Sequence, residues 1–299
     1  MSSPAATSRL PQRRAAAERL AAALPPLLIA AERTAQAVLH GEHGRRRAGP
    51  GDAFWQYRPY GPGDSAADID WRKSARADRV LVRETEWMAA NTLWVWVQND
   101  PGMRWRSHLA DTEKAERTAL IALALATLAV KAGERIAPLG GPFRPDHTRR
   151  ALQNLARHLD PAGAADTAVP PPADIARFST CLLIGDFFAE PEALEARIRR
   201  LAANGASGHL LQVVDPAEET FPFHGRTRFE RPGGADHLIF GRAEEVRDGY
   251  HRELAALRDR LRALARRIGW TFSLHRTDQP PQAAVLALHE RITSPGAAP

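Results

Sequence analysis

The chain has 299 residues, of which 44% are hydrophobic and 25% are charged, and this composition excludes a chain without a packed core. Its net charge of +6 comes almost entirely from arginine, because only three of the 41 basic residues are lysine, and so small an excess does not favour nucleic-acid binding. The single cysteine excludes an internal disulfide, and no stretch reaches the roughly 20 apolar residues of a membrane-spanning helix. We therefore expect a cytoplasmic protein without a membrane span.

Residues 1–50 are predicted to form an N-terminal helical segment and a linker. Alanine and arginine recur with helical spacing up to about residue 39, with an interruption at Pro25 and Pro26. The glycine- and arginine-rich linker that follows contains three consecutive arginines at 45–47. This cluster is more typical of a solvated loop than of a phosphate-binding site.

Residues 51–90 concentrate aromatic, acidic and arginine side chains. A tight turn is predicted at 61–64 and a strand at 79–83. Carboxylates here can accept paired hydrogen bonds from a guanidinium, so the segment is either a buried ion-pair network that ties the fold together or a surface that contacts a partner. Both interpretations stay open at this point. The candidate residues are Arg58, Tyr60, Asp64, Asp70, Trp71, Arg72, Ser74, Arg76, Arg83 and Glu84.

Strands and helices alternate through the remaining segment, residues 91–299. Short apolar runs predict strands at 93–97, 136–139, 181–184, 209–214 and 270–274. Helical spacing predicts helices at 113–132, 148–159, 191–204, 242–268 and 281–289. Residues 223–240 predict a β-hairpin insertion. This alternation is typical of an α/β fold with a mainly parallel sheet and helices on both faces.

The residues of segment 51–90 resemble the motif of a known family, the domain of unknown function 58 (DUF58) family. The resemblance implies a von Willebrand factor A-like (Rossmann-like) α/β fold of the soluble, shorter type. It also implies a protein often encoded beside MoxR-type AAA+ ATPases, with no established enzymatic activity. The matching stretches are 54–60, 62–64, 69–72 and 74–76, followed further along the chain by 215–219, 225–226 and 275–278.

Von Willebrand factor A domains hold a metal ion at the carboxyl ends of their strands, with an aspartate, two serines, a threonine and a second aspartate. The resemblance places Gln98 at the first aspartate and Asp100 and Gly102 at the serines, so this metal-ion-dependent adhesion site is degenerate. Asp186 matches the second aspartate, and Thr148 is a candidate for the threonine. We expect no cofactor, with Mg²⁺ held by Asp100, Asp186 and Thr148 as the alternative.

The sequence favours a non-enzymatic protein-interaction module, because it contains no recognised catalytic motif. The resemblance implies that the module works with a MoxR-type AAA+ ATPase on an unknown client protein, in maturation or remodelling. Two alternatives stay open. One is a nucleic-acid-binding protein that uses residues 45–47 and the helix around Arg258, Arg262 and Arg266. The other is a metal-dependent enzyme whose reaction the sequence does not define.

Overall fold

The computed structural model describes residues 27–39, 54–61, 69–77, 79–85, 91–159, 168–177, 179–230 and 237–293. These residues form two compact units. The larger unit takes its residues from Met1–Gly41 and Asn91–Pro299, and the smaller unit from Glu42–Ala90. The helix over residues 27–39 therefore belongs to the larger unit, where its side chains Ala31, Ala35 and Val38 are buried in the core.

The larger unit is built on a five-stranded parallel sheet, as predicted. Its strands lie in the order β4–β3–β5–β6–β9, so the chain reverses direction across the sheet between β3 and β5. In doubly wound α/β sheets this switch point is where ligands generally bind, beyond the carboxyl ends of the strands. The strands are β3 Thr92–Val97, β4 Arg135–Pro138, β5 Thr180–Gly185, β6 Ser207–Val214 and β9 Thr271–Arg276.

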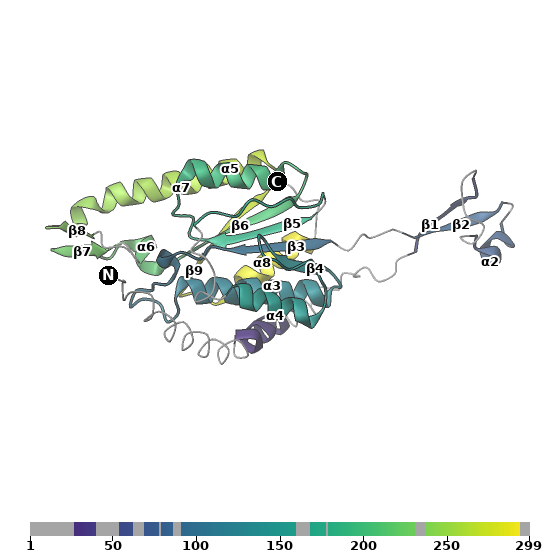
Figure 1. The fold of residues 1–299 in the computed structure, drawn as a ribbon, viewed down its shortest axis with the longest axis horizontal. Helices are drawn as coiled ribbons and strands as arrows, with labels where there is room; N and C mark the ends of the chain where they lie inside the picture. The colour runs from purple at the N-terminus through teal and green to yellow at the C-terminus, as the bar shows by residue number, and fades with distance from the viewer. Residues whose placement is uncertain are drawn as a thin grey trace, which may run out of the picture. The chain divides into compact units, whose positions relative to one another are not determined.

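Helices cover both faces of this sheet (Figure 1). One face carries α3, α4, α8 and the helix over residues 27–39, and the other face carries α5 and α7. None of the helices within the described ranges is long and apolar enough to cross a bilayer. The bounds are α3 Lys114–Lys131, α4 Arg149–His158, α5 Pro191–Ala202, α7 Arg247–Arg267 and α8 Pro281–Thr293.

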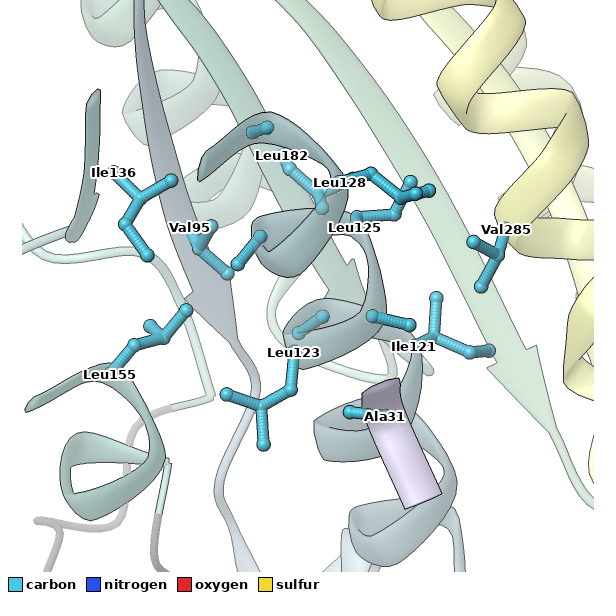
Figure 2. Packing of buried hydrophobic residues seen from close by; sticks show 14 of the residues in the cluster. Ala31, Val95, Ile121, Leu123, Leu125, Leu128, Ile136, Leu155, Leu182 and Val285 are labelled. Atoms are coloured by element: carbon cyan, nitrogen blue, oxygen red, sulfur yellow. The ribbon is translucent and has the colours of Figure 1, made fainter. Parts of the chain in front are cut away.

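The two faces of the sheet are filled by alternate residues of the same strands. In β5, Leu182 packs toward α3, whereas Cys181 and Leu183 pack toward α5 and α7. Figure 2 shows Leu182 together with Leu125 and Leu128 of α3, in the core beneath the sheet. Full burial of one such leucine contributes about 1.5–3 kcal/mol, so these two clusters supply much of the stability of the larger unit.

The predicted β-hairpin is present as β7 Thr227–Glu230 paired with antiparallel β8 His237–Phe240. Phe229 of β7 stacks on Phe221, with ring centroids 5.7 Å apart. Three short helices in the described part of the larger unit were not predicted as separate elements, because each spans about one turn and shows no periodicity. They are η2 Pro101–Met103, α6 Pro216–Thr220 and η3 Ala243–Val246.

The described residues of the smaller unit form a two-stranded antiparallel ladder and one short helix. β1 Phe54–Pro59 pairs with β2 Leu81–Thr85, which begins two residues later than the predicted strand at 79–83. The helix α2 Trp71–Ser74 lies between them in the chain. The backbone N–H of Asp70 donates to the carbonyl oxygen of Leu81 (3.0 Å), which ties the start of this helix to β2.

Candidate functional site

Two polar side chains meet at the switch point of the sheet. Gln98 directly follows β3 and Asp186 directly follows β5, and both are buried. Because parallel strands end at the same edge, the amide Nε2 of Gln98 reaches the Oδ1 atom of Asp186 at 2.8 Å. The amide Oε1 of Gln98 accepts a hydrogen bond from the backbone N–H of Phe187 (2.9 Å). The structure thus brings Asp186, a candidate metal ligand, together with Gln98, the residue that stands in place of the first aspartate of the metal site.

Asp100 joins this pair through Gln98, whose Nε2 also donates to Asp100 Oδ2 (2.5 Å). The other oxygen of Asp100 accepts from the backbone N–H of Gly102 (2.7 Å). A Cβ atom at Gly102 would lie 2.9 Å from Asp100 Oδ1, so a serine here would force the carboxylate to move. A Cβ atom at Gly185 would lie 2.3 Å from Gln98 Oε1. Both glycines are therefore needed for this arrangement.

Lys114, the first residue of α3, provides the positive charge of the site. Its side chain is 1% exposed, and its Nζ atom lies 2.8 Å from Asp186 Oδ2 and 2.5 Å from Glu218 Oε1. Burial alone would lower the pKa of Lys114, but the attraction of Asp186 and Glu218 outweighs it, so the pKa is raised and the side chain is an ammonium ion. Its charge also lies 5.5 Å from the centre of the Phe188 ring, within cation–π range.

Short helix α6 positions Glu218 for this contact. Asp215 caps the helix by accepting from the backbone N–H of Ala217 (2.8 Å), and Glu218 Oε2 accepts from the backbone N–H of Asp215 (2.8 Å), which is a capping box. The second oxygen of Asp215 accepts from the backbone N–H of Ser107 (2.8 Å). The 215–219 run is therefore explained by helix capping and by the ion pair with Lys114.

The residues present do not fit Mg²⁺. Each oxygen of Asp100 and Asp186 already accepts a hydrogen bond, and the Lys114 ammonium stands 2.8 Å from Asp186 Oδ2. Thr148 precedes α4 and donates its hydroxyl to Asp146 Oδ2 (2.6 Å). Within the described residues, no group of three or more histidine, cysteine, aspartate or glutamate side chains is arranged to hold a metal ion.

Two of the arginines of the nucleic-acid alternative, Arg258 and Arg262, have partners of their own. Arg258 makes a two-point ion pair with Glu219 and donates to Gln212 Oε1 (3.0 Å), and its side chain is 12% exposed. Arg262 pairs with Asp259 at 3.0 Å. Residues 45–47 lie outside the described residues. Arg258 thus fastens α7 to α6 and β6 rather than offering a free charge.

The candidate residues of segment 51–90 include several exposed side chains. Asp70 is half-buried and caps α2, since its Oδ1 accepts from the backbone N–H of Lys73 (2.9 Å). The hydroxyl of Ser74 donates to the carbonyl of Asp70 (2.8 Å) and accepts from the N–H of Leu81 (2.9 Å). Asp64 lies outside the described residues, whereas Arg58, Arg83 and Glu84 lie in the β1–β2 ladder. The exposed members are Tyr60, Trp71, Arg72 and Arg76.

Replacing Asp70 by alanine is expected to destabilise α2 by about 1 kcal/mol, the usual cost of losing a helix N-cap. Amide hydrogen exchange over residues 69–85 measures this locally and should be about fivefold faster in the variant. Asp70→Ser keeps a capping oxygen and serves as the control. A loss of several kcal/mol in Asp70→Ala alone would instead indicate a buried ion-pair network.

A family model described as "Protein of unknown function DUF58" matches residues 56–260, more than half of the chain. The chain belongs to the DUF58 family. Uncharacterized proteins of Mycobacterium bovis and Mycobacterium tuberculosis are each 27% identical to this DUF58 protein over 278 residues, which cover 87% of this chain and 86% of theirs. Lys114 and the switch point fall within the matched range, as does the smaller unit from residue 56 onward.

Two solved structures are similar to this DUF58 protein at 10% sequence identity and a TM-score of 0.39. One is the conserved hypothetical protein BatB of Bacteroides thetaiotaomicron, and the other is an aerotolerance-related membrane protein of Bacteroides fragilis. Each match covers 68% of this chain and 98% of the solved chain. A TM-score this low does not establish a shared fold.

Lys114 was not predicted from the sequence as a member of the site. Its partners Asp186 and Glu218 are 72 and 104 residues away in the chain, so no local pattern links them. One signal was present, because Lys114 is one of only three lysines in a chain that otherwise uses arginine.

Proposed function

We propose that this DUF58 protein is a non-enzymatic protein-interaction module that works in the cytoplasm with a MoxR-type AAA+ ATPase on an unknown client protein. The observation that carries the proposal is the closed network at the switch point. The carboxylates of Asp100, Asp186 and Glu218 are occupied by Gln98 and by the Lys114 ammonium. A general acid or base must instead reach a substrate proton, and in this network those carboxylate oxygens are already engaged.

Apolar side chains are exposed beside this network. Phe188 is 44% exposed, and its backbone N–H donates to Asp186 Oδ1 (2.9 Å), which fixes the residue at the sheet edge. Leu109 is 41% exposed, on a loop that is held through Ser107 and Asp215. Rigid aromatic side chains of this kind are enriched among the residues that dominate protein–protein binding energy. We infer that the switch-point edge contacts the partner.

Recovery of partners from the cell lysate of the source organism tests this proposal. Tagged full-length protein is expected to retain an AAA+ ATPase when a non-hydrolysable ATP analogue is present, and Phe188→Ala is expected to weaken that binding about tenfold. Leu238→Ala is the matched control, because Leu238 is exposed on the β7–β8 hairpin. Failure to recover any ATPase or assembly factor in the nucleotide-bound condition would contradict the proposal.

A further inference from the structure

We propose that the Lys114 ammonium permanently fills the cation position between Asp186 and Glu218, so that the switch-point site is complete without a divalent metal and accepts one only when Lys114 is removed. Asp186 and Glu218 come from different elements, the end of β5 and helix α6. The ammonium contacts one oxygen of each, at 2.8 Å and 2.5 Å. Bridging carboxylates from separate elements is a task that proteins commonly give to a bound cation.

The choice of lysine at this position fits that role. The chain contains 38 arginines and three lysines, yet the cation buried here is lysine. An ammonium is a compact point charge, whereas a guanidinium is planar and presents a fixed fork of donors. Only the compact ion resembles a metal ion in size and symmetry. We therefore expect Lys114→Arg to disrupt the site even though it keeps the charge.

Gln98 gives the site the same net charge that an aspartate and a divalent ion would give it. An aspartate at this position beside a divalent ion would give one net positive charge, and neutral Gln98 beside the Lys114 ammonium gives the same total. The amide also donates from Nε2 to both Asp100 Oδ2 (2.5 Å) and Asp186 Oδ1 (2.8 Å). An aspartate could not do this, since it has only acceptor oxygens when ionised. Gln98 and Lys114 thus act as a compensating pair.

Removing the Lys114 ammonium should make the site able to bind a divalent cation. In Lys114→Ala the carboxylates of Asp186 and Glu218 would face the vacated volume without a positive charge between them. Two close like charges favour binding of a cation or uptake of a proton. Two carboxylates with water as the remaining ligands are a common set for Mg²⁺ and Mn²⁺. The variant should therefore gain a metal response that the parent protein lacks.

Thermal melts of the full chain with EDTA or with millimolar MnCl₂ test this. The parent is expected to melt at the same temperature in EDTA and in MnCl₂. In EDTA, Lys114→Ala should melt at a lower temperature than the parent, and Mn²⁺ should raise the melting temperature of this variant by several degrees. The double variant Lys114→Ala/Asp186→Asn should lose that recovery. Lys131→Ala removes an exposed lysine from the same helix and should behave as the parent. A folded Lys114→Ala protein that does not respond to Mn²⁺ would overturn the proposal.

Calorimetric titration of the parent with Mn²⁺ covers the case in which Lys114→Ala does not fold. A flat trace supports the proposal. Binding of Mn²⁺ to the parent that disappears in Asp186→Asn overturns it, because the metal would then share the site with Lys114. Neither result depends on which partner protein is bound.

Discussion

Asp186→Ala should lower the free energy of unfolding by about 3–5 kcal/mol, the usual cost of breaking a buried ion pair by removing one partner. The variant leaves the Lys114 ammonium with Glu218 alone, in a position that is 1% exposed. The Gln98 amide, which keeps its bond to Asp100, and the backbone N–H of Phe188 each lose Asp186 as an acceptor as well. The loss should therefore lie toward the upper end of that range, because a buried donor left without an acceptor is costly.

Urea unfolding followed by circular dichroism measures this change, with the slope of the transition showing whether the parent and variant expose the same surface. Asp278→Ala is the matched control, because Asp278 pairs with Arg276 at the end of β9 but is exposed. Surface pairs of this kind contribute less than about 1 kcal/mol. Equal losses in the two variants would show that the Lys114–Asp186 pair contributes little to stability.

Acidification from pH 7.5 to pH 5 should destabilise the larger unit by about 4 kcal/mol through two buried histidines. Burial, with a smaller effect of Arg291, lowers the pKa of His209 to about 4. Burial, with a smaller effect of Arg117, likewise lowers the pKa of His275 to about 4. Both are neutral in the folded state at pH 5, whereas in the unfolded chain they bind protons below their ordinary pKa of about 6.5. Stability is therefore lost as the pH falls from about 6.5 toward 4.

Urea midpoints at the two pH values measure this loss. His209→Gln and His275→Gln should each remove about 2 kcal/mol of the pH dependence, since glutamine does not titrate. His147→Gln is the control, because the His147 side chain is 65% exposed. If the parent showed equal stability at both pH values, the two histidines would not be held neutral by the fold.

Most of the larger unit could be predicted from the sequence because its elements are long or strongly apolar. The apolar run at 181–184 became β5, and the apolar helix at 113–132 became α3, each within about two residues. The meeting of Gln98 with Asp186 also followed from sequence, because both lie at strand ends and parallel strands end at one edge. Such predictions succeed where a property repeats along several residues.

The short helices and the ion pairs of the site could not be predicted, because they depend on contacts between distant parts of the chain. Helix α6 is one turn long, and only its capping residues Asp215 and Glu218 mark it in the sequence. Lys114 begins an apolar helix, where a lysine would ordinarily lie in solvent, and only the folded structure shows that it is buried between two carboxylates. Likewise, Thr148 was only a candidate for the threonine of the metal site, and in the structure its hydroxyl donates to Asp146 instead.

The buried position of Cys181 in β5 has a practical consequence for spectroscopy. The thiol is fully buried, and burial raises its pKa to about 12, so at neutral pH it carries almost no reactive thiolate. A cysteine introduced at an exposed position would therefore be the one thiol of this chain that a maleimide dye labels in the folded state. Leu109→Cys would place a fluorophore on the loop next to the switch point. The protein thus permits single-site labelling without prior removal of its natural cysteine.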